Sequence, residues 1–161
     1  SCESGDVVRW GRNSRLDNLQ AAVLLPKMRR INESIATRRR LASMYHAQLE
    51  GIAELILPPP PDESRDALHF DVFQNYEIEA ENRDGLRAHL TASGIGTILQ
   101  WGGSAVHEFE GLGIDVHLPR TEAVMRRSLL LPMNTSLSDS EIDRVCEMVG
   151  EYQLRYAGAR A

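Results

Sequence analysis

The amino-acid sequence predicts an α+β fold, in which long N-terminal helices precede a small, partly antiparallel sheet covered by helices. Two observations support this prediction. Residues 16–49 follow the periodicity of helices, with one interruption. Beyond them, helical stretches alternate with short stretches that are typical of strands, in the order strand, helix, strand, loop, helix, strand, helix. We therefore expect the initial helices to stand outside the sheet layer and to need another surface to pack on.

Composition and charge limit the class of protein. The chain has 161 residues, 42% hydrophobic and 25% charged, as is usual for a soluble folded domain and unlike a disordered chain. A formal net charge of −5 argues against a nucleic-acid surface or a polybasic membrane anchor. Cys2 and Cys146 have the spacing of neither a zinc site nor a disulfide framework, so we expect no metal and a reducing compartment, the cytoplasm. The first residues carry no initiator methionine or leader pattern, and we expect a longer protein around this chain.

The N-terminal helical segment is interrupted by Pro26, which removes an amide donor and clashes with the preceding turn. We expect a kink or two helices, roughly 16–27 and 30–50, with Gly51 at the end of the second. The expected buried stripe of the second helix is Ile31, Ile35, Leu41, Met44 and Tyr45. The arginines at 38–40 could bind phosphate, but a basic run on a helix more often forms a solvated face.

The first strand is expected at 69–79, after four prolines at 58–61 that predict a stiff connector in polyproline conformation. A helix capped by Asn82 should follow, ending at 93–94, and a shorter strand at 95–100. In the first strand, the residues expected on a common face are Phe70, Val72, Tyr76 and Ile78. In the helix, the expected apolar face consists of Leu86 and Leu90.

The C-terminal third begins with an irregular, glycine-rich stretch at 101–120. Thr121 is expected to cap a short helix, and 128–131 to form an apolar strand. A capping box at 138–141 predicts the start of the last helix. The apolar stripe of that helix is Ile142, Val145, Met148, Val149 and Tyr152.

No self-contained active site is visible in the residues. The chain has neither a nucleophile motif nor histidines at metal-ligand spacing. Trp101 could stack on a flat ligand, although a tryptophan at a strand end is more often a packing residue. His107 follows in the same glycine-rich stretch and could be presented to a ligand from it. Asn13 and Arg15 precede a helix, where amide and guanidinium donors suit a phosphate or carboxylate, or Asn13 or Ser14 could simply cap the helix.

The sequence resembles the C-terminal part of the DegT-type nucleotide-sugar aminotransferases, pyridoxal-phosphate enzymes of the aspartate-aminotransferase fold. The resemblance starts at Gly11-Arg12-Asn13-Ser14-Arg15-Leu16-Asp17 and covers nearly the whole chain. Further segments that match in the same order are 38–45, 82–86, 93–97, His107, 118–122, 131–134, 137–138 and 141–142. One departure concerns Gln100-Trp101-Gly102-Gly103, where many members carry a His-Tyr-Pro-type loop.

The resemblance implies pyridoxal phosphate as cofactor, a nucleotide-linked keto sugar as substrate and glutamate as the expected amino donor. It implies a homodimer with a composite active site, in which Asn13 reaches the cofactor phosphate of the neighbour, with Arg15 close to it, and Trp101 and His107 face the sugar. Residues 1–50 would link to a large domain, and residues 51–161 would form the small α+β domain.

The Schiff-base lysine of the family lies upstream of the matched motif. Lys27, the only lysine here, does not match it, so we expect no catalytic residue in this chain and no activity from it alone. Two other interpretations stay open. One is a non-catalytic module for dimerisation or ligand sensing, and the other is a sugar dehydratase relative.

Overall fold

The computed structural model describes residues 17–61 and 70–160. Its elements are α1 (Asn18–Met28), α2 (Ile31–Leu49), β1 (Leu55–Ile56), β2 (Tyr76–Ala80), α3 (Arg83–Ala92), the 3-10 turns η1 (Gln100–Gly103), η2 (Val106–Glu108) and η3 (Glu110–Leu112), α4 (Pro119–Arg127), β3 (Ser128–Leu131) and α5 (Asp139–Arg160). The predicted α+β fold is confirmed.

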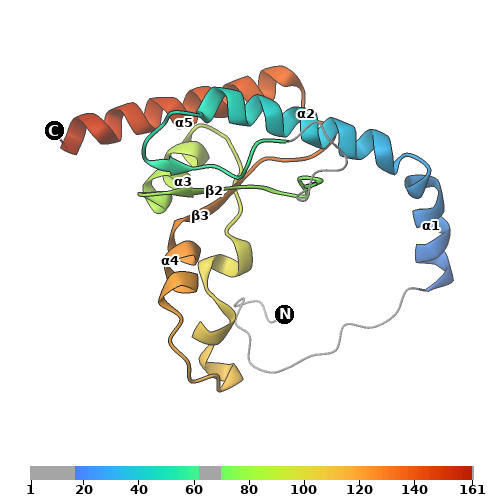
Figure 1. Cartoon of the computed structure of the whole chain (residues 1–161), viewed down its shortest axis with the longest axis horizontal. Helices are drawn as coiled ribbons and strands as arrows, with labels where there is room; N and C mark the ends of the chain where they lie inside the picture. Colours follow the sequence, from blue (N-terminus) through green and yellow to red (C-terminus); the bar gives the residue numbers. More distant parts are fainter. Residues whose placement is uncertain (1–16, 62–69, 161) are drawn as a thin grey trace.

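The sheet is three-stranded and antiparallel, with the order β1-β2-β3. In β2, Tyr76, Ile78 and Ala80 are buried, whereas Glu77 and Glu79 alternate with them and point to the opposite face. Helices α2 and α5 run side by side along the buried face (Figure 1). On the side away from these two helices, α4 with the 3-10 turns and α1 project from the layer as two arms (Figure 1).

The core lies between the sheet and the helices α2, α3 and α5. Its largest fully buried side chains include Tyr45 of α2, Phe73 and Tyr76. Leu41, Tyr45 and Leu49 make α2 part of the layer, contrary to the expectation that both initial helices stand outside it. Helix α1 does stand apart, because none of its described residues is buried.

The predicted boundaries are confirmed for several elements. Asn82 caps α3 through a 3.2 Å hydrogen bond that its side chain accepts from the amide of Gly85. Strand β3 has the predicted bounds. Ser138 and Glu141 form the capping box of α5, because the Ser138 amide donates to Oε2 of Glu141 at 2.8 Å and the Glu141 amide donates to Oγ of Ser138 at 3.3 Å.

The first predicted strand was too long. Strand β2 holds only the last part of the predicted stretch 69–79 and continues to Ala80. At Phe73 the backbone enters the left-handed region with φ of 51°, which breaks the alternation of faces. Phe73 therefore turns into the core, while Val72 is exposed. Among the connector residues, 57–61 form no regular element, and 62–69 lie outside the described residues.

Three other expectations need correction. The stretch 95–100 forms one antiparallel bridge, Ile98 to Leu130, and no strand, because η1 already begins at Gln100. Helix α4 begins at Pro119 and not after Thr121, since proline needs no amide partner in the first turn. Helix α1 begins at Asn18 and not at residue 16, because Asp17 is its cap. The Asp17 side chain accepts a hydrogen bond from the amide of Gln20. The two-residue strand β1 was not predicted.

Candidate functional site

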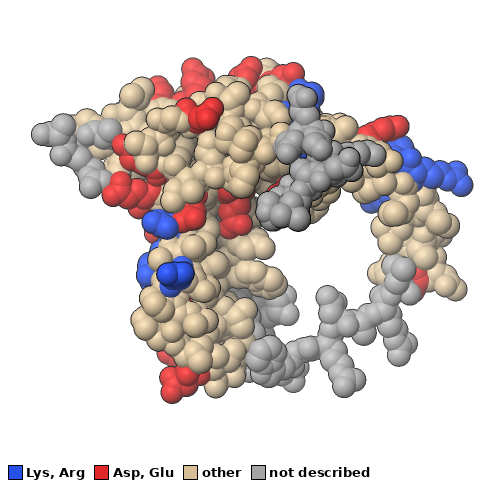
Figure 2. Space-filling view, viewed as in Figure 1, with Lys and Arg blue, Asp and Glu red and all other residues tan. Residues whose placement is uncertain are grey.

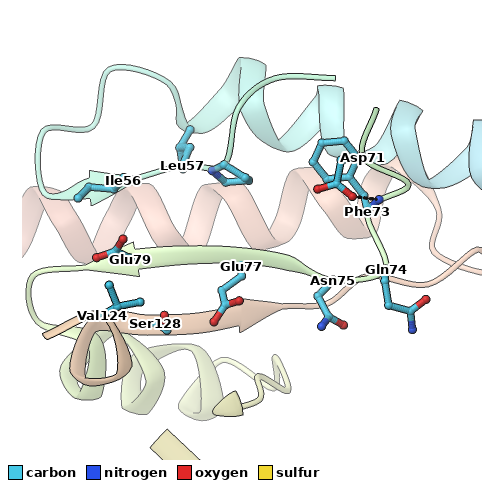
Figure 3. Close-up of a pocket in the computed structure, with 11 residues that line it drawn as sticks. Ile56, Leu57, Asp71, Phe73, Gln74, Asn75, Glu77, Glu79, Val124 and Ser128 are labelled. Carbon is cyan, nitrogen blue, oxygen red and sulfur yellow. Dashed lines mark hydrogen bonds between the residues drawn. The ribbon is translucent and has the colours of Figure 1, made fainter. Parts of the chain in front are cut away.

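The open face of the sheet carries a cavity of about 460 Å³. Its lining comes from β1, β2, β3, α4 and the segments beside them, as Figure 3 shows. The lining residues are Ile56, Leu57, Pro58, Asp71, Phe73, Gln74, Asn75, Glu77, Glu79, Val124 and Ser128. The ion pair between Glu79 and Arg127, at 2.6 Å, ties the middle strand to the end of α4 at this cavity. Figure 2 shows basic side chains over α4 next to acidic ones of the sheet layer.

The wall at 71–75 is held by the arginine run of α2. Nη1 of Arg38 donates to the carbonyl oxygens of Phe73 at 3.1 Å and Gln74 at 2.8 Å. Arg39 donates to the carbonyl of Asp71, and its guanidinium stands 4.1 Å from the centre of the Phe70 ring. The run is therefore not simply a solvated face, because two of its guanidinium groups hold a neighbouring segment.

Trp101 lies in η1, which contacts β3 and α4. Its backbone is left-handed, with φ of 52°, and Gly102 and Gly103 continue with φ of 73° and 86°. Three such residues in succession make a sharp turn that leaves Trp101 68% exposed. The exposed position rules out a core-packing role within the described residues and leaves the ring able to stack on a ligand.

The turn at Gly103 lies close to the side chain of Arg83. Its side chain is largely buried, and Nη1 donates to the carbonyl oxygens of Met125 at 3.1 Å and Ser128 at 3.4 Å. A Cβ atom at Gly103 would stand 3.2 Å from the same Nη1 atom. Because glycine has no Cβ atom, the backbone of the turn can approach Arg83 closely. Arg83 in turn links α3 to α4 and β3.

His107 lies in η2 against α4. Its Nε2 atom is 3.2 Å from Oε1 of Glu122, and the side chain is only 7% exposed. Oε1 of Glu122 also accepts from the amide of Leu118 at 2.9 Å and stands 2.9 Å from Nδ1 of His117. These contacts hold the pKa of Glu122 below its ordinary value, first through the Leu118 amide and then through His107.

Sequence reasoning placed Trp101 and His107 in one loop but missed Glu122 and Arg83. In the structure, η1 and the segment of His107 both lie beside α4. A signal for Glu122 was present, because a glutamate four residues after Leu118 can reach back to the start of a helix that begins with proline. Nothing local in the sequence indicated that His107 and His117 would meet this carboxylate.

The other candidate residues give a limited result. Asn13 and Arg15 lie outside the described residues. Lys27 is exposed on α1, away from the cavity lining. In the described ranges, no three histidine, cysteine or acidic side chains gather as a metal site would require. Nor does any helix there have the length and apolar character to cross a membrane.

Comparison with known proteins places this arrangement in a family. Residues 3–150 match the model of the DegT/DnrJ/EryC1/StrS aminotransferase family. The dTDP-3-amino-3,4,6-trideoxy-alpha-D-glucose transaminase of Streptomyces venezuelae is 32% identical over 90% of this chain and 38% of its own length.

Solved structures agree with this match. A DegT DnrJ EryC1 StrS aminotransferase from Brucella abortus superposes with a TM-score of 0.74 and 33% identity, over 92% of this chain and 39% of that one. The ntda protein of Bacillus subtilis, solved with bound cofactor PMP, gives a TM-score of 0.70 and 26% identity over 91% and 34% of the two chains. The chain spans about 40% of the length of the curated relatives it matches. On this combined sequence and structural match, the chain belongs to the DegT/DnrJ/EryC1/StrS aminotransferase family.

Proposed function

We propose that the full-length protein, meaning the polypeptide as its gene encodes it, transfers an amino group from glutamate to a nucleotide-linked keto sugar. This chain would supply the C-terminal part of that cytoplasmic, pyridoxal-phosphate-dependent enzyme. The observation that carries the proposal is the family match over residues 3–150. It is supported by the similar Streptomyces venezuelae protein, whose name is that of a dTDP-sugar transaminase.

We expect no residue of this chain to form the covalent bond to the cofactor. That role needs a lysine, and Lys27 does not match the Schiff-base lysine of the family, which the resemblance places upstream. We therefore place the Schiff-base lysine elsewhere in the full-length protein. When bound, pyridoxal phosphate supplies the electron sink for amino transfer. Asn13 and Arg15 would contribute an amide and a guanidinium donor to its phosphate.

The substrate would be bound in part by Trp101 and His107. Trp101 offers an exposed indole face, which suits the flat base of a nucleotide or the apolar face of a sugar. His107 is mostly buried, so its contribution is limited to the part of the ring that is not turned toward Glu122. Both residues lie on the arm that projects beyond the open face of the sheet (Figure 1).

A homodimer with a composite site is part of the proposal. Helix α1 exposes an apolar surface that a folded protein normally covers. Its exposed apolar residues are Leu19, Val23, Leu24, Leu25 and Met28. We infer that other parts of the full-length protein and its second copy cover this surface.

The proposal is tested on the purified full-length protein. Its absorbance spectrum should show bound cofactor, and incubation with glutamate and a dTDP- or UDP-linked keto sugar should yield the amino sugar by mass spectrometry. Absence of cofactor would favour a non-catalytic module. Loss of water from the sugar without amine formation would favour a dehydratase. Trp101→Ala should raise KM for the nucleotide sugar and leave KM for glutamate unchanged, while Val106→Ala, at an exposed position nearby, serves as the control.

A further inference from the structure

The two ends of the segment 107–117, His107 and His117, both contact one carboxylate oxygen of Glu122. Oε1 of Glu122 is 3.2 Å from Nε2 of His107, 2.9 Å from Nδ1 of His117 and 2.9 Å from the amide nitrogen of Leu118. The glutamate side chain is 13% exposed, so the site is largely shielded from water. Arg126 stands 4.0 Å from the second carboxylate oxygen and adds a positive charge on that side.

The chemistry of this contact determines where the proton of His107 lies. An ionised carboxylate can only accept hydrogen bonds, so the imidazole nitrogen that faces it must carry hydrogen. In the neutral ring of His107 this nitrogen is Nε2, and Nδ1 is then left with a free lone pair. The two nitrogens therefore have different roles, which the position of Glu122 assigns.

Nδ1 of His107 is the ring nitrogen that Glu122 leaves without a partner. It makes no hydrogen bond within the described part of the chain. The His107 side chain as a whole is 7% exposed, so only a small part of it reaches solvent. A ligand group that donates a hydrogen bond could reach it, whereas a carbonyl or phosphate oxygen would meet a lone pair in the neutral ring.

We propose that Glu122 is a positioning residue that holds His107 as the Nε2–H tautomer, and that Nδ1 of His107 accepts a hydrogen bond from a hydroxyl group of the sugar. The second half of this proposal rests on the proposed function. His117 has a lesser role, because its side chain is 78% exposed and its link to Glu122 can open into water. The matched pair for the test is thus Glu122→Gln against His117→Ala.

The first measurement reads the tautomer without any reaction. In the full-length protein labelled with ¹⁵N-histidine, two-bond proton–nitrogen correlations distinguish the Nε2–H form from the Nδ1–H form. We expect the neutral ring of wild-type His107 to be in the Nε2–H form. Glu122→Gln should populate both forms, because an amide can donate as well as accept, whereas His117→Ala should leave the signal of His107 unchanged. An Nδ1–H signal in the wild type overturns the proposal, and this arm requires no variant to fold.

The second measurement reads substrate binding. A lost hydrogen bond of ordinary strength corresponds to about a tenfold change, so Glu122→Gln should raise KM for the nucleotide sugar about tenfold with KM for glutamate unchanged. Glu122→Asp, which keeps the carboxylate, should recover part of the loss. In a His107→Ala background, Glu122→Gln should have no further effect. If Glu122→Gln raises KM as much in the His107→Ala background as in the wild type, Glu122 does not act through His107 and its positioning role is overturned.

The two arms separate this inference from the proposed function. If the tautomer behaves as expected but no nucleotide sugar is converted, the proposed function and the sugar contact fail, and the action of Glu122 on His107 stands. If amino transfer occurs but the tautomer is the Nδ1–H form, the proposed function stands and the role given to Glu122 is overturned.

Discussion

The hydroxyl group of Tyr45 donates a 2.8 Å hydrogen bond to the carbonyl oxygen of Pro132, across 87 positions of the chain. This bond joins α2 to the segment after β3. The ring of Tyr45 stacks on that of Tyr76 with 4.7 Å between ring centres. The hydroxyl of Tyr76, equally buried, has no hydrogen-bond partner within the described residues. Burial raises the pKa of both phenols above the ordinary value, so both stay neutral.

The two tyrosines should respond differently to loss of the hydroxyl. Tyr45→Phe leaves the Pro132 carbonyl without its partner and should lower the free energy of unfolding by about 1–2 kcal/mol. Tyr76→Phe removes a buried polar atom that bonds to nothing described and should be neutral or stabilising. Urea unfolding of the two variants of the full-length protein measures both effects, and equal losses would contradict this assignment.

Two helical glycines form a second matched pair. A Cβ atom at Gly85 of α3 would lie 2.1 Å from the hydroxyl oxygen of Tyr152, whereas one at Gly150 of α5 would meet nothing within 4 Å. Gly85→Ala should therefore destabilise the fold by about 1–3 kcal/mol despite the better helix propensity of alanine. Gly150→Ala should stabilise it by about 0.5–1 kcal/mol. Thermal unfolding followed by circular dichroism gives the direction of both changes in stability. Higher stability of Gly85→Ala would show that Tyr152 moves away freely.

We expect Arg38 to contribute more to the free energy of unfolding than Arg30, an exposed arginine at the start of α2. Nη1 of Arg38 donates to both carbonyl oxygens, and lysine, with its shorter side chain, would not bring its ammonium group to the position of that atom. Arg38→Lys should cost about 1 kcal/mol in unfolding free energy. Arg30→Lys, in an exposed pair with Glu33, should cost less than about 0.5 kcal/mol. Comparable losses in chemical denaturation would remove the special role of Arg38 in holding 71–74.

Asn13 provides a test of the cofactor assignment. In the full-length protein, Asn13→Ala should weaken retention of pyridoxal phosphate, because a phosphate oxygen loses an amide donor. The measurement is the cofactor absorbance that remains after dialysis, with Ser14→Ala as the neighbouring control. Retention equal to wild type would remove Asn13 from the site.

The start of α5 should respond to acid. The pKa of Glu141 is lowered first by the backbone amide of Ser138 and then by its hydroxyl. A carboxyl group whose pKa is lower in the folded state stabilises the fold above its ordinary pKa, and this contribution is lost as pH falls through the folded value. Ser138→Ala removes only the hydroxyl, so the pKa should rise part of the way toward 4.5, as a carbon-detected NMR titration would show. A pKa that does not move would mean that the backbone amide acts alone.

Much of the fold could be predicted because local signals were strong. Asn82, the capping box at Ser138 and the apolar run of β3 each define an element without help from distant residues. The prediction was wrong where a distant contact decides the backbone. Phe73 leaves the expected strand, and Arg38, 35 positions earlier, donates to its carbonyl oxygen. A period-two pattern contains no information about such a contact.

The sequence by itself determined the family resemblance, the order of the five described α-helices with strands β2 and β3, and the presence of Trp101 and His107 on one irregular stretch, because these depend on residue type and spacing alone. Only the tertiary structure decided that His107 turns its Nε2 atom to Glu122 while Trp101 faces solvent. The physical reason is that a side chain's partner depends on which segments the fold brings within hydrogen-bond distance. For His107 that partner lies 15 positions away on a different helix.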